Sequence, residues 1–212
     1  MRYDGVIFDM DSTLVDSLPA IVRVWTRFAE RYGLTADDLF GHFGRSTAAI
    51  VARLVDEGRR AEALAWISEQ ELVDQGGVVA LPGAAEALRA AGPRRAVATS
   101  ATRPMAYARL AAAGLPTPAV LITASDVARA KPDPQIFLAA AAGLGVAPES
   151  CLVAEDAPNG LRAARAAGMS TVAVTTTHTA EELAPLADLV VPDLSHIGLR
   201  FDGARVELTV RR

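Results

Sequence analysis

The sequence is poor in the residue types that hold small secreted domains or zinc sites together. Its 212 residues include one cysteine and three histidines, and aromatic residues make up 5% of the chain. A single cysteine cannot build a disulfide framework, and no cluster of histidine and cysteine indicates zinc. Cys151 lies in the apolar run 151–154, where we expect a small buried side chain and not a reactive thiol. A chain of this length can instead bury a sizeable hydrophobic core.

The chain also lacks long apolar runs and a large excess of one charge. Its formal net charge is -4, without long blocks of like charge, which argues against nucleic acid or acidic membranes as partners. No apolar run approaches the length that spans a bilayer, and residues 1–5 do not form a basic segment leading into an apolar stretch. We therefore expect a soluble, cytoplasmic protein, either a monomer or a small homo-oligomer.

Short apolar segments alternate with alanine-rich helical stretches along most of the sequence. Alternation of strands and helices predicts right-handed crossovers and a mostly parallel sheet covered on both faces. The predicted fold class is thus α/β, with a Rossmann-like core, and an Asp202-Gly203 turn predicts a hairpin over residues 200–212. The expected strands of the sheet are residues 6–8, 95–98, 119–122, 151–154, 171–174 and 189–191.

One long segment interrupts this alternation. Residues 16–79 contain no convincing strand and are predicted to form amphipathic helices. We expect them to be a helical cap domain, inserted into a catalytic core made of residues 1–15 and 80–212. The two chain crossings would form a hinge, with substrate bound between cap and core.

Polar residues follow several of the predicted strands. Ligands of open parallel sheets bind beyond the carboxyl ends of the strands, so these residues are expected to meet at one edge. Each group alone has an ordinary explanation: the aspartates suit turns, Ser100 could cap the next helix, and Asp133 before Pro134 resembles a helix N-cap. The groups are Asp9 to Thr13, Thr99-Ser100, Lys131 to Pro134 and Glu155-Asp156.

Considered together, these residues indicate a phosphate site that contains a metal ion. Several carboxylates at one edge would repel one another and would need a cation to be tolerated. A small set of oxygen ligands suits Mg²⁺, which keeps several waters and commonly also binds a substrate phosphate. Hydroxyl groups of Thr99 and Ser100 could donate to phosphate oxygens, and Lys131, in a loop restricted by two prolines, could supply positive charge.

In order and spacing, these groups resemble the four motifs of haloacid dehalogenase-like phosphatases with a helical cap. The resemblance covers nearly the whole chain, and within that family it is nearest to the sugar- and polyol-phosphate phosphatase branch, which includes proteins like β-phosphoglucomutase and glycerol phosphatase. The motifs are Asp9-Met10-Asp11-Ser12-Thr13, Thr99, Lys131-Pro132-Asp133-Pro134 and Glu155-Asp156-Ala157-Pro158-Asn159-Gly160.

The resemblance implies Mg²⁺-dependent hydrolysis of a small phosphate monoester, a phosphorylated sugar or polyol. Asp9 would attack phosphorus and form an aspartyl-phosphate, while Asp11 would protonate the leaving alcohol and later activate water. The expected metal ligands are the side chains of Asp9 and Asp156 and the backbone carbonyl of Asp11. Glu155 is expected outside the metal's ligand set, where it would orient a metal-bound water or Lys131.

Two positions carry separate expectations. Ser12 stands where the family usually has glycine, so the turn must either avoid strongly positive φ or accept some strain. In the cap, residues 41–47 interrupt the helical pattern, and Arg45 or His42 could contact substrate hydroxyl groups. The alternative for Arg45 and His42 is that they lie in a solvated loop between helices.

Two other functions use similar residues. A sugar-phosphate mutase resembling β-phosphoglucomutase shares the core motifs, but such mutases carry a histidine in the first cap helix, and residues 16–29 contain none. A phospho-receiver signalling module also combines aspartates, Thr, Lys and Mg²⁺. It lacks the helical insertion and the second aspartate of the nucleophile motif, so hydrolysis is favoured.

Overall fold

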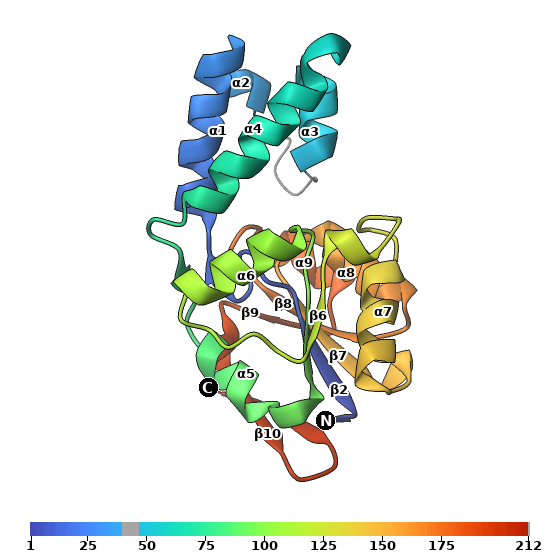
Figure 1. Ribbon diagram of the computed structural model, residues 1–212. Coiled ribbons are helices and arrows are strands. Elements are labelled where there is room, and N and C mark those ends of the chain that lie inside the picture. The colour runs from blue at the N-terminus through green and yellow to red at the C-terminus, as the bar shows by residue number, and fades with distance from the viewer. Residues whose placement is uncertain (40–46, 212) are drawn as a thin grey trace.

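The computed structural model describes residues 1–39 and 47–211, and its largest element is a six-stranded sheet (Figure 1). The strand order is β6-β5-β2-β7-β8-β9, and each neighbouring pair is parallel. All six expected apolar runs form these strands, which confirms the α/β, Rossmann-like fold class. The strands are β2 (Gly5–Phe8), β5 (Arg95–Ala98), β6 (Val120–Ile122), β7 (Cys151–Glu155), β8 (Ser170–Val174) and β9 (Leu189–Val191).

Helices cover both faces of this sheet. They are α5 (Ala84–Ala90), α6 (Arg103–Ala112), α7 (Gln135–Leu144), α8 (Pro158–Ala166) and α9 (Ala180–Leu183). On β2, Phe8 packs in the cluster that contains Leu110 of α6, whereas Ile7 packs in the cluster that contains Phe137 of α7. Successive strand residues point to opposite faces, so both apolar faces are buried and polar groups are placed beyond the strand ends.

A smaller antiparallel sheet closes the end of the molecule that holds both termini (Figure 1). It contains β1 (Arg2–Tyr3), β11 (Val206–Val210) and β10 (Ile197–Phe201), in that order. The predicted C-terminal hairpin is therefore confirmed. In its turn, the Asp202 carboxylate accepts hydrogen bonds from the backbone N–H groups of Ala204 and Arg205.

Four helices stand apart from the sheet, at the top of Figure 1. They are α1 (Leu18–Tyr32), α2 (Ala36–Leu39), α3 (Thr47–Leu54) and α4 (Arg60–Val73). Their inward faces form a separate hydrophobic cluster around Phe28, whose ring lies 5.1 Å from that of Trp25 and 4.5 Å from that of Tyr32, centroid to centroid. This helical segment thus has a core of its own.

Two short strands connect the helical segment to the sheet. They are β3 (Val15–Asp16) and β4 (Val79–Ala80), and they pair antiparallel, with Val15 opposite Ala80. The outgoing and returning chains are therefore held side by side. Strands of two residues are too short to leave a pattern in the sequence, and neither was expected.

Short 3₁₀ helices complete the connections. They are Glu57–Arg59, Gly92–Arg94, Ala124–Asp126, Pro148–Ser150, Ala184–Leu186 and Leu194–His196. None of the helices in residues 1–39 and 47–211 is both long and apolar enough to cross a membrane.

Candidate active site

A buried lysine joins three loops at the carboxyl edge of the sheet. Lys131 Nζ lies 2.6 Å from Asp9 Oδ1 and 2.8 Å from Glu155 Oε1, and it also donates to the carbonyl oxygen of Ala98 at 3.3 Å. Asp9 follows β2 directly, and Glu155 is the last residue of β7. The sheet register therefore brings together side chains that are 122 and 24 residues away from Lys131 in sequence.

The charges in this cluster do not balance. Asp9, Glu155 and Asp156 are buried, and one carboxylate oxygen from each lies within 4.8 Å of the others. Burial by itself lowers the pKa of Lys131, but the neighbouring carboxylates of Asp9 and Glu155 raise that pKa above its usual value. The lysine is therefore charged, and one positive charge faces three acidic groups.

The pKa values of Asp9 and Asp156 are raised. Burial raises the pKa of Asp9 well above its usual value; Lys131 opposes this shift, and the charges of Glu155 and Asp156 add to it. Burial and the charge of Glu155 likewise raise the pKa of Asp156 to about 7. A divalent cation among these oxygen ligands would remove the imbalance, so the donor set fits a hard metal ion.

Hydrogen bonds distinguish the roles of the two acidic residues at the end of β7. Glu155 Oε1 is engaged by Lys131, and its Oε2 accepts a hydrogen bond of 2.7 Å from the backbone N–H of Ala157. Asp156 is held by hydroxyl groups instead, from Thr13 at 3.3 Å and from Thr177 at 2.5 Å. Glu155 is thus fixed by a cation and an amide. Asp156 accepts hydrogen bonds from neutral hydroxyl groups, which bind a carboxylate less strongly than a cation does.

Thr13 and Thr177 were not expected to support the site. Thr177 follows the end of β8, within the polar run 175–178, so the rule that identified the other loops could have found it. Thr13 lies inside the first motif, but its sequence position gives no indication that it contacts Asp156.

The carboxylate of Asp11 lies apart from this cluster and points toward other partners. Its Oδ1 accepts a hydrogen bond of 2.6 Å from Ser17 Oγ, and its Oδ2 accepts one of 2.7 Å from Arg109 Nη1. Ser17 precedes α1, and Arg109 belongs to α6. Neither partner was expected from the sequence, because a serine before a helix and an arginine in an alanine-rich helix are both common.

Of the two conformations considered for Ser12, the structure has the strained one, with positive φ. Its φ is 62°, and it is the only residue other than glycine with positive φ in the described part of the chain. The backbone N–H of Ser12 donates to the carbonyl of Val15 at 2.8 Å, and its own carbonyl accepts from the Thr176 hydroxyl. These contacts hold a conformation that costs on the order of 1 kcal/mol for a residue with a side chain.

The second loop places a buried hydroxyl group at the same edge. Thr99 follows β5, is 1% exposed, and accepts a hydrogen bond of 3.1 Å from the backbone N–H of Ala101. Because its oxygen acts as the acceptor there, its proton can be donated elsewhere. Ser100 is exposed, and the N-cap of α6 is Thr102, so Ser100 does not cap that helix.

The remaining sequence-based expectations have mixed outcomes. Asp133 does contact the start of α7, where it accepts a hydrogen bond of 3.0 Å from the backbone N–H of Gln135. Cys151 is buried, and burial raises the pKa of its thiol to about 11, as suits an unreactive side chain. Arg45 and His42 lie outside the described residues.

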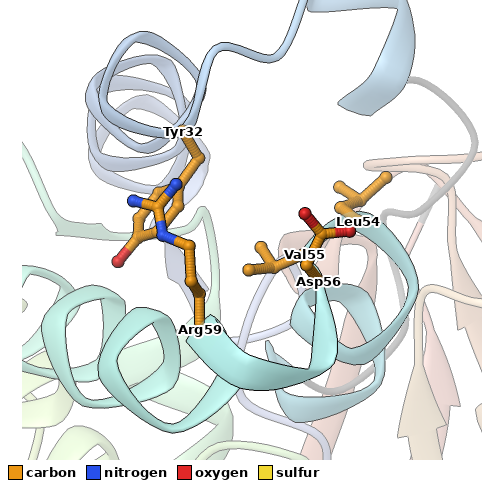
Figure 2. A pocket seen from close by; sticks show the side chains of 5 residues that line it. All are labelled: Tyr32, Leu54, Val55, Asp56 and Arg59. Carbon is orange, nitrogen blue, oxygen red and sulfur yellow. The ribbon is translucent and has the colours of Figure 1, made fainter.

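A separate hollow occurs within the helical segment, and Figure 2 shows the side chains that line it. The Arg59 guanidinium carbon lies 4.7 Å from the centroid of the Tyr32 ring. The lining residues are Tyr32, Leu54, Val55, Asp56 and Arg59. None of these belongs to the loops around Lys131, so this hollow is distinct from the candidate active site.

Comparison with known proteins identifies the family. The family model described as haloacid dehalogenase-like hydrolase matches residues 3–168. The chain is a haloacid dehalogenase-like hydrolase. It is 38% identical over 204 residues to Hexitol phosphatase A of Escherichia coli K12, covering 93% of this chain and 94% of that protein. It is 37% identical to Validoxylamine A 7'-phosphate phosphatase of Streptomyces hygroscopicus subsp. limoneus, covering 92% and 96% of the two chains.

Solved structures give the same assignment for this hydrolase. CbbY from Rhodobacter sphaeroides in complex with phosphate superposes with a TM-score of 0.80 and 25% identity, covering 91% of this chain and 95% of that one. A hydrolase from Pseudomonas syringae superposes with a TM-score of 0.77 and 28% identity, covering 90% and 94%. The predicted family and enzyme class, a phosphoric monoester hydrolase, are confirmed.

Proposed function

We propose that this hydrolase removes phosphate from a small sugar or polyol phosphate, with Mg²⁺ as cofactor and Asp9 as nucleophile. The observation that carries the proposal is the buried cluster in which Lys131 lies between Asp9 and Glu155, with Asp156 beside them. Relatives named as hexitol, fructose-1-phosphate and glycerol-1-phosphate phosphatases support the substrate class.

The metal site in this proposal uses Asp9, whose ion pair with Lys131 is made through Oδ1, and Asp156, whose oxygens accept hydrogen bonds from hydroxyl groups. Asp9 and Asp156 would supply carboxylate oxygens and Asp11 a backbone carbonyl. Glu155 is excluded from the ligand set because Lys131 and the Ala157 N–H already engage both of its oxygens. The bound ion would supply positive charge next to the phosphate, and its presence would relieve the repulsion among the buried carboxylates.

Phosphate would be held by hydroxyl groups and by the ammonium group of Lys131 at the same edge of the sheet. The Thr99 hydroxyl has a proton to donate, Ser100 adds an exposed hydroxyl, and Lys131 places its ammonium group beside the nucleophile. Such preorganised donors meet the charge that develops on the phosphoryl oxygens.

The reaction would proceed in two transfers that share the same pair of carboxylates. An oxygen of Asp9 attacks phosphorus and forms the aspartyl-phosphate, while the ester P–O bond breaks and Asp11 gives a proton to the leaving alcohol. Asp11 then takes a proton from water. That water attacks the phosphorus of the intermediate, which releases inorganic phosphate and restores the Asp9 carboxylate.

We assign residues 1–15 and 80–212 to a catalytic core and residues 16–79 to a cap domain, with the β3-β4 pair as the hinge. The separate hydrophobic cluster around Phe28 and the side-by-side crossings at Val15 and Ala80 support this division. Substrate would bind between the two domains, so that the core recognises phosphate and metal while the cap selects the alcohol.

The proposal is tested by measuring phosphate release from a panel of sugar, polyol and other small monophosphates, with Mg²⁺ and with excess chelator. We expect the highest kcat/KM for a sugar or polyol phosphate and loss of turnover with chelator or in Asp9→Asn. Asp4→Asn, at the opposite end of β2, is the matched control and should retain activity, since Asp4 pairs with Arg205. Turnover that persists without metal contradicts the proposal, and conversion of a sugar phosphate to an isomer without phosphate release indicates a mutase instead.

A further inference from the structure

We propose that Arg109 is a positioning residue that fixes the carboxylate of Asp11 for proton transfer to the leaving alcohol. This inference rests on the proposed function, in which Asp11 is the general acid. Arg109 lies on α6, outside the four motif loops, and its guanidinium contacts Asp11 at 2.7 Å. Nothing in the motif pattern assigns it a part in the reaction.

The geometry holds Asp11 from two directions. Arg109 Nη1 donates to Oδ2, and the Ser17 hydroxyl donates to Oδ1 at 2.6 Å. Arg109 comes from a helix that packs on the sheet, whereas Ser17 lies where the chain enters the helical segment. With both oxygens engaged, the carboxylate cannot rotate freely about its terminal bond, so its direction is set by groups on both sides of the hinge.

Arg109 is more deeply buried than Asp11, as suits a residue that positions Asp11. The side chain of Arg109 is 8% exposed, while that of Asp11 is 25% exposed. The guanidinium therefore reaches Asp11 from inside the protein and leaves part of the carboxylate accessible.

A second carboxylate, from the helical segment, lies in the field of the same arginine. Glu71 of α4 accepts hydrogen bonds of 3.1 Å from Trp25 Nε1 and from Thr47 Oγ1. Burial raises the pKa of Glu71, the charge of Arg109 lowers it, and the charge of Asp11 raises it again. The charge of Arg109 thus acts both on Asp11, which it contacts, and on Glu71 of the helical segment.

The chemistry predicts which reactions need this positioning. The alkoxide of a sugar or polyol is a poor leaving group and must be protonated as the P–O bond breaks, whereas a nitrophenolate leaves without a proton. A displacement of about 1 Å of a catalytic group can cost on the order of 100-fold in rate. Loss of Arg109 should therefore slow the hydrolysis of alkyl phosphates and leave the hydrolysis of aryl phosphates nearly unaffected.

The test compares Arg109→Met with Arg103→Met, an arginine on the same helix that pairs with Asp126. For each, kcat/KM is measured with the best alkyl phosphate of the panel and with p-nitrophenyl phosphate, since kcat/KM reports the step in which the ester bond breaks. We expect Arg109→Met to lose about 30- to 100-fold with the alkyl ester and less than about threefold with the aryl ester. Arg103→Met should change neither, and Arg109→Lys should recover part of the alkyl activity.

Equal losses with both esters, or no loss with either, would overturn the inference, because a purely structural role does not distinguish leaving groups. If Arg109→Met fails to fold, Ser17→Ala removes the other hydrogen bond to Asp11 and should give the same selective loss, about 5- to 10-fold. An equal loss with both esters there contradicts the inference as well. Asp9→Asn separates this result from the proposed function. If Asp9→Asn stays active, the proposed function is wrong. If Asp9→Asn is inactive while Arg109→Met behaves like Arg103→Met, the proposed function stands and the inference about Arg109 is wrong.

Discussion

The core contains a buried cluster of charged residues that has no counterpart among the ion pairs of the described part of the helical cap segment. In the core, Lys131 is buried between Asp9 and Glu155, and its side chain is 8% exposed. In the cap, Arg23 and Arg27 of α1 are roughly half exposed and both pair with Asp74, just past the end of α4. Burying a charge costs desolvation free energy, whereas an exposed ion pair contributes little to stability. The contrast supports the proposal that the reaction takes place in the core.

After Asp9→Asn, which should be inactive, the largest effect is expected from Lys131→Met. Removal of the ammonium group leaves Asp9 and Glu155 buried without their shared partner, and it removes a charge that would hold the substrate phosphate. We expect kcat/KM to fall about 1000-fold. Arg129→Met, at an exposed cation of the same loop that pairs with Asp133, is the matched control and should stay within about twofold of the original enzyme. A Lys131→Met variant that keeps a tenth of the activity would contradict the contrast between buried and exposed charges.

An intermediate effect is expected from Gly160→Ala, at the start of α8. A Cβ atom there would lie 1.7 Å from Glu155 Oε1, so Glu155 would have to leave Lys131 and the Ala157 N–H. We expect a loss of about 2–4 kcal/mol in the free energy of unfolding and about 100-fold in kcat/KM.

Gly58→Ala in the cap is the matched control for this change. Among the described residues, no atom lies within 4 Å of a Cβ added at Gly58. Its stability should change by less than about 0.5 kcal/mol, and its activity should be unaltered. Urea unfolding and kinetics of the two variants check both statements. Equal behaviour of the two glycine variants would show that Glu155 is free to move, which contradicts its role in holding Lys131.

The smallest effect is expected from Asp74→Asn. Hydrogen bonds from Arg23 and, to a smaller extent, from Arg27 lower the pKa of Asp74 to about 2, although burial acts in the opposite direction. A carboxyl group whose folded pKa is depressed contributes stability above its unfolded pKa, near 4, and loses it as pH falls toward 2. Asp74→Asn should therefore destabilise the cap by about 0.5–1 kcal/mol at pH 7 and by nearly nothing at pH 2.

Tryptophan fluorescence measures this cap stability directly, because both tryptophans of the chain, Trp25 and Trp66, lie in the helical segment. Glu69→Gln, at an exposed acid of α4, is the control for the loss of one negative charge and should change the stability at pH 7 by less than about 0.5 kcal/mol. A difference between Asp74→Asn and the original protein that is the same at pH 7 and pH 2 would contradict the assigned cause.

The sequence predicted the core better than the cap for a physical reason. Each strand of a parallel sheet is a short apolar run, and the residue after it reaches the same edge, so Asp9, Thr99 and Asp156 could be placed from pattern alone. The cap has amphipathic helices whose relative placement depends on side-chain packing around Phe28, which a pattern does not encode. Its expected substrate contacts, Arg45 and His42, stay predictions.

The residues missed in the site have a common property. Ser17, Arg109 and Thr177 contact motif carboxylates from outside the motifs, at separations of 6, 98 and 21 residues in sequence. Nothing local distinguishes Arg109 from Arg103, six residues earlier on the same helix, yet one contacts Asp11 and the other pairs with the exposed Asp126. Whether an arginine contacts Asp11 therefore depends on how the helix packs and not on its local sequence.

The most direct test of the proposed mechanism is to ask whether phosphate becomes attached to Asp9. The enzyme is mixed with its best substrate carrying a labelled phosphoryl group, quenched in acid within milliseconds, digested, and mapped by mass spectrometry. We predict label on the peptide that contains Asp9, released by hydroxylamine as expected of an acyl phosphate, and no label in Asp9→Asn, which should also be inactive. Full turnover without label at Asp9, or label on a different residue, would contradict the assignment of Asp9 as the nucleophile.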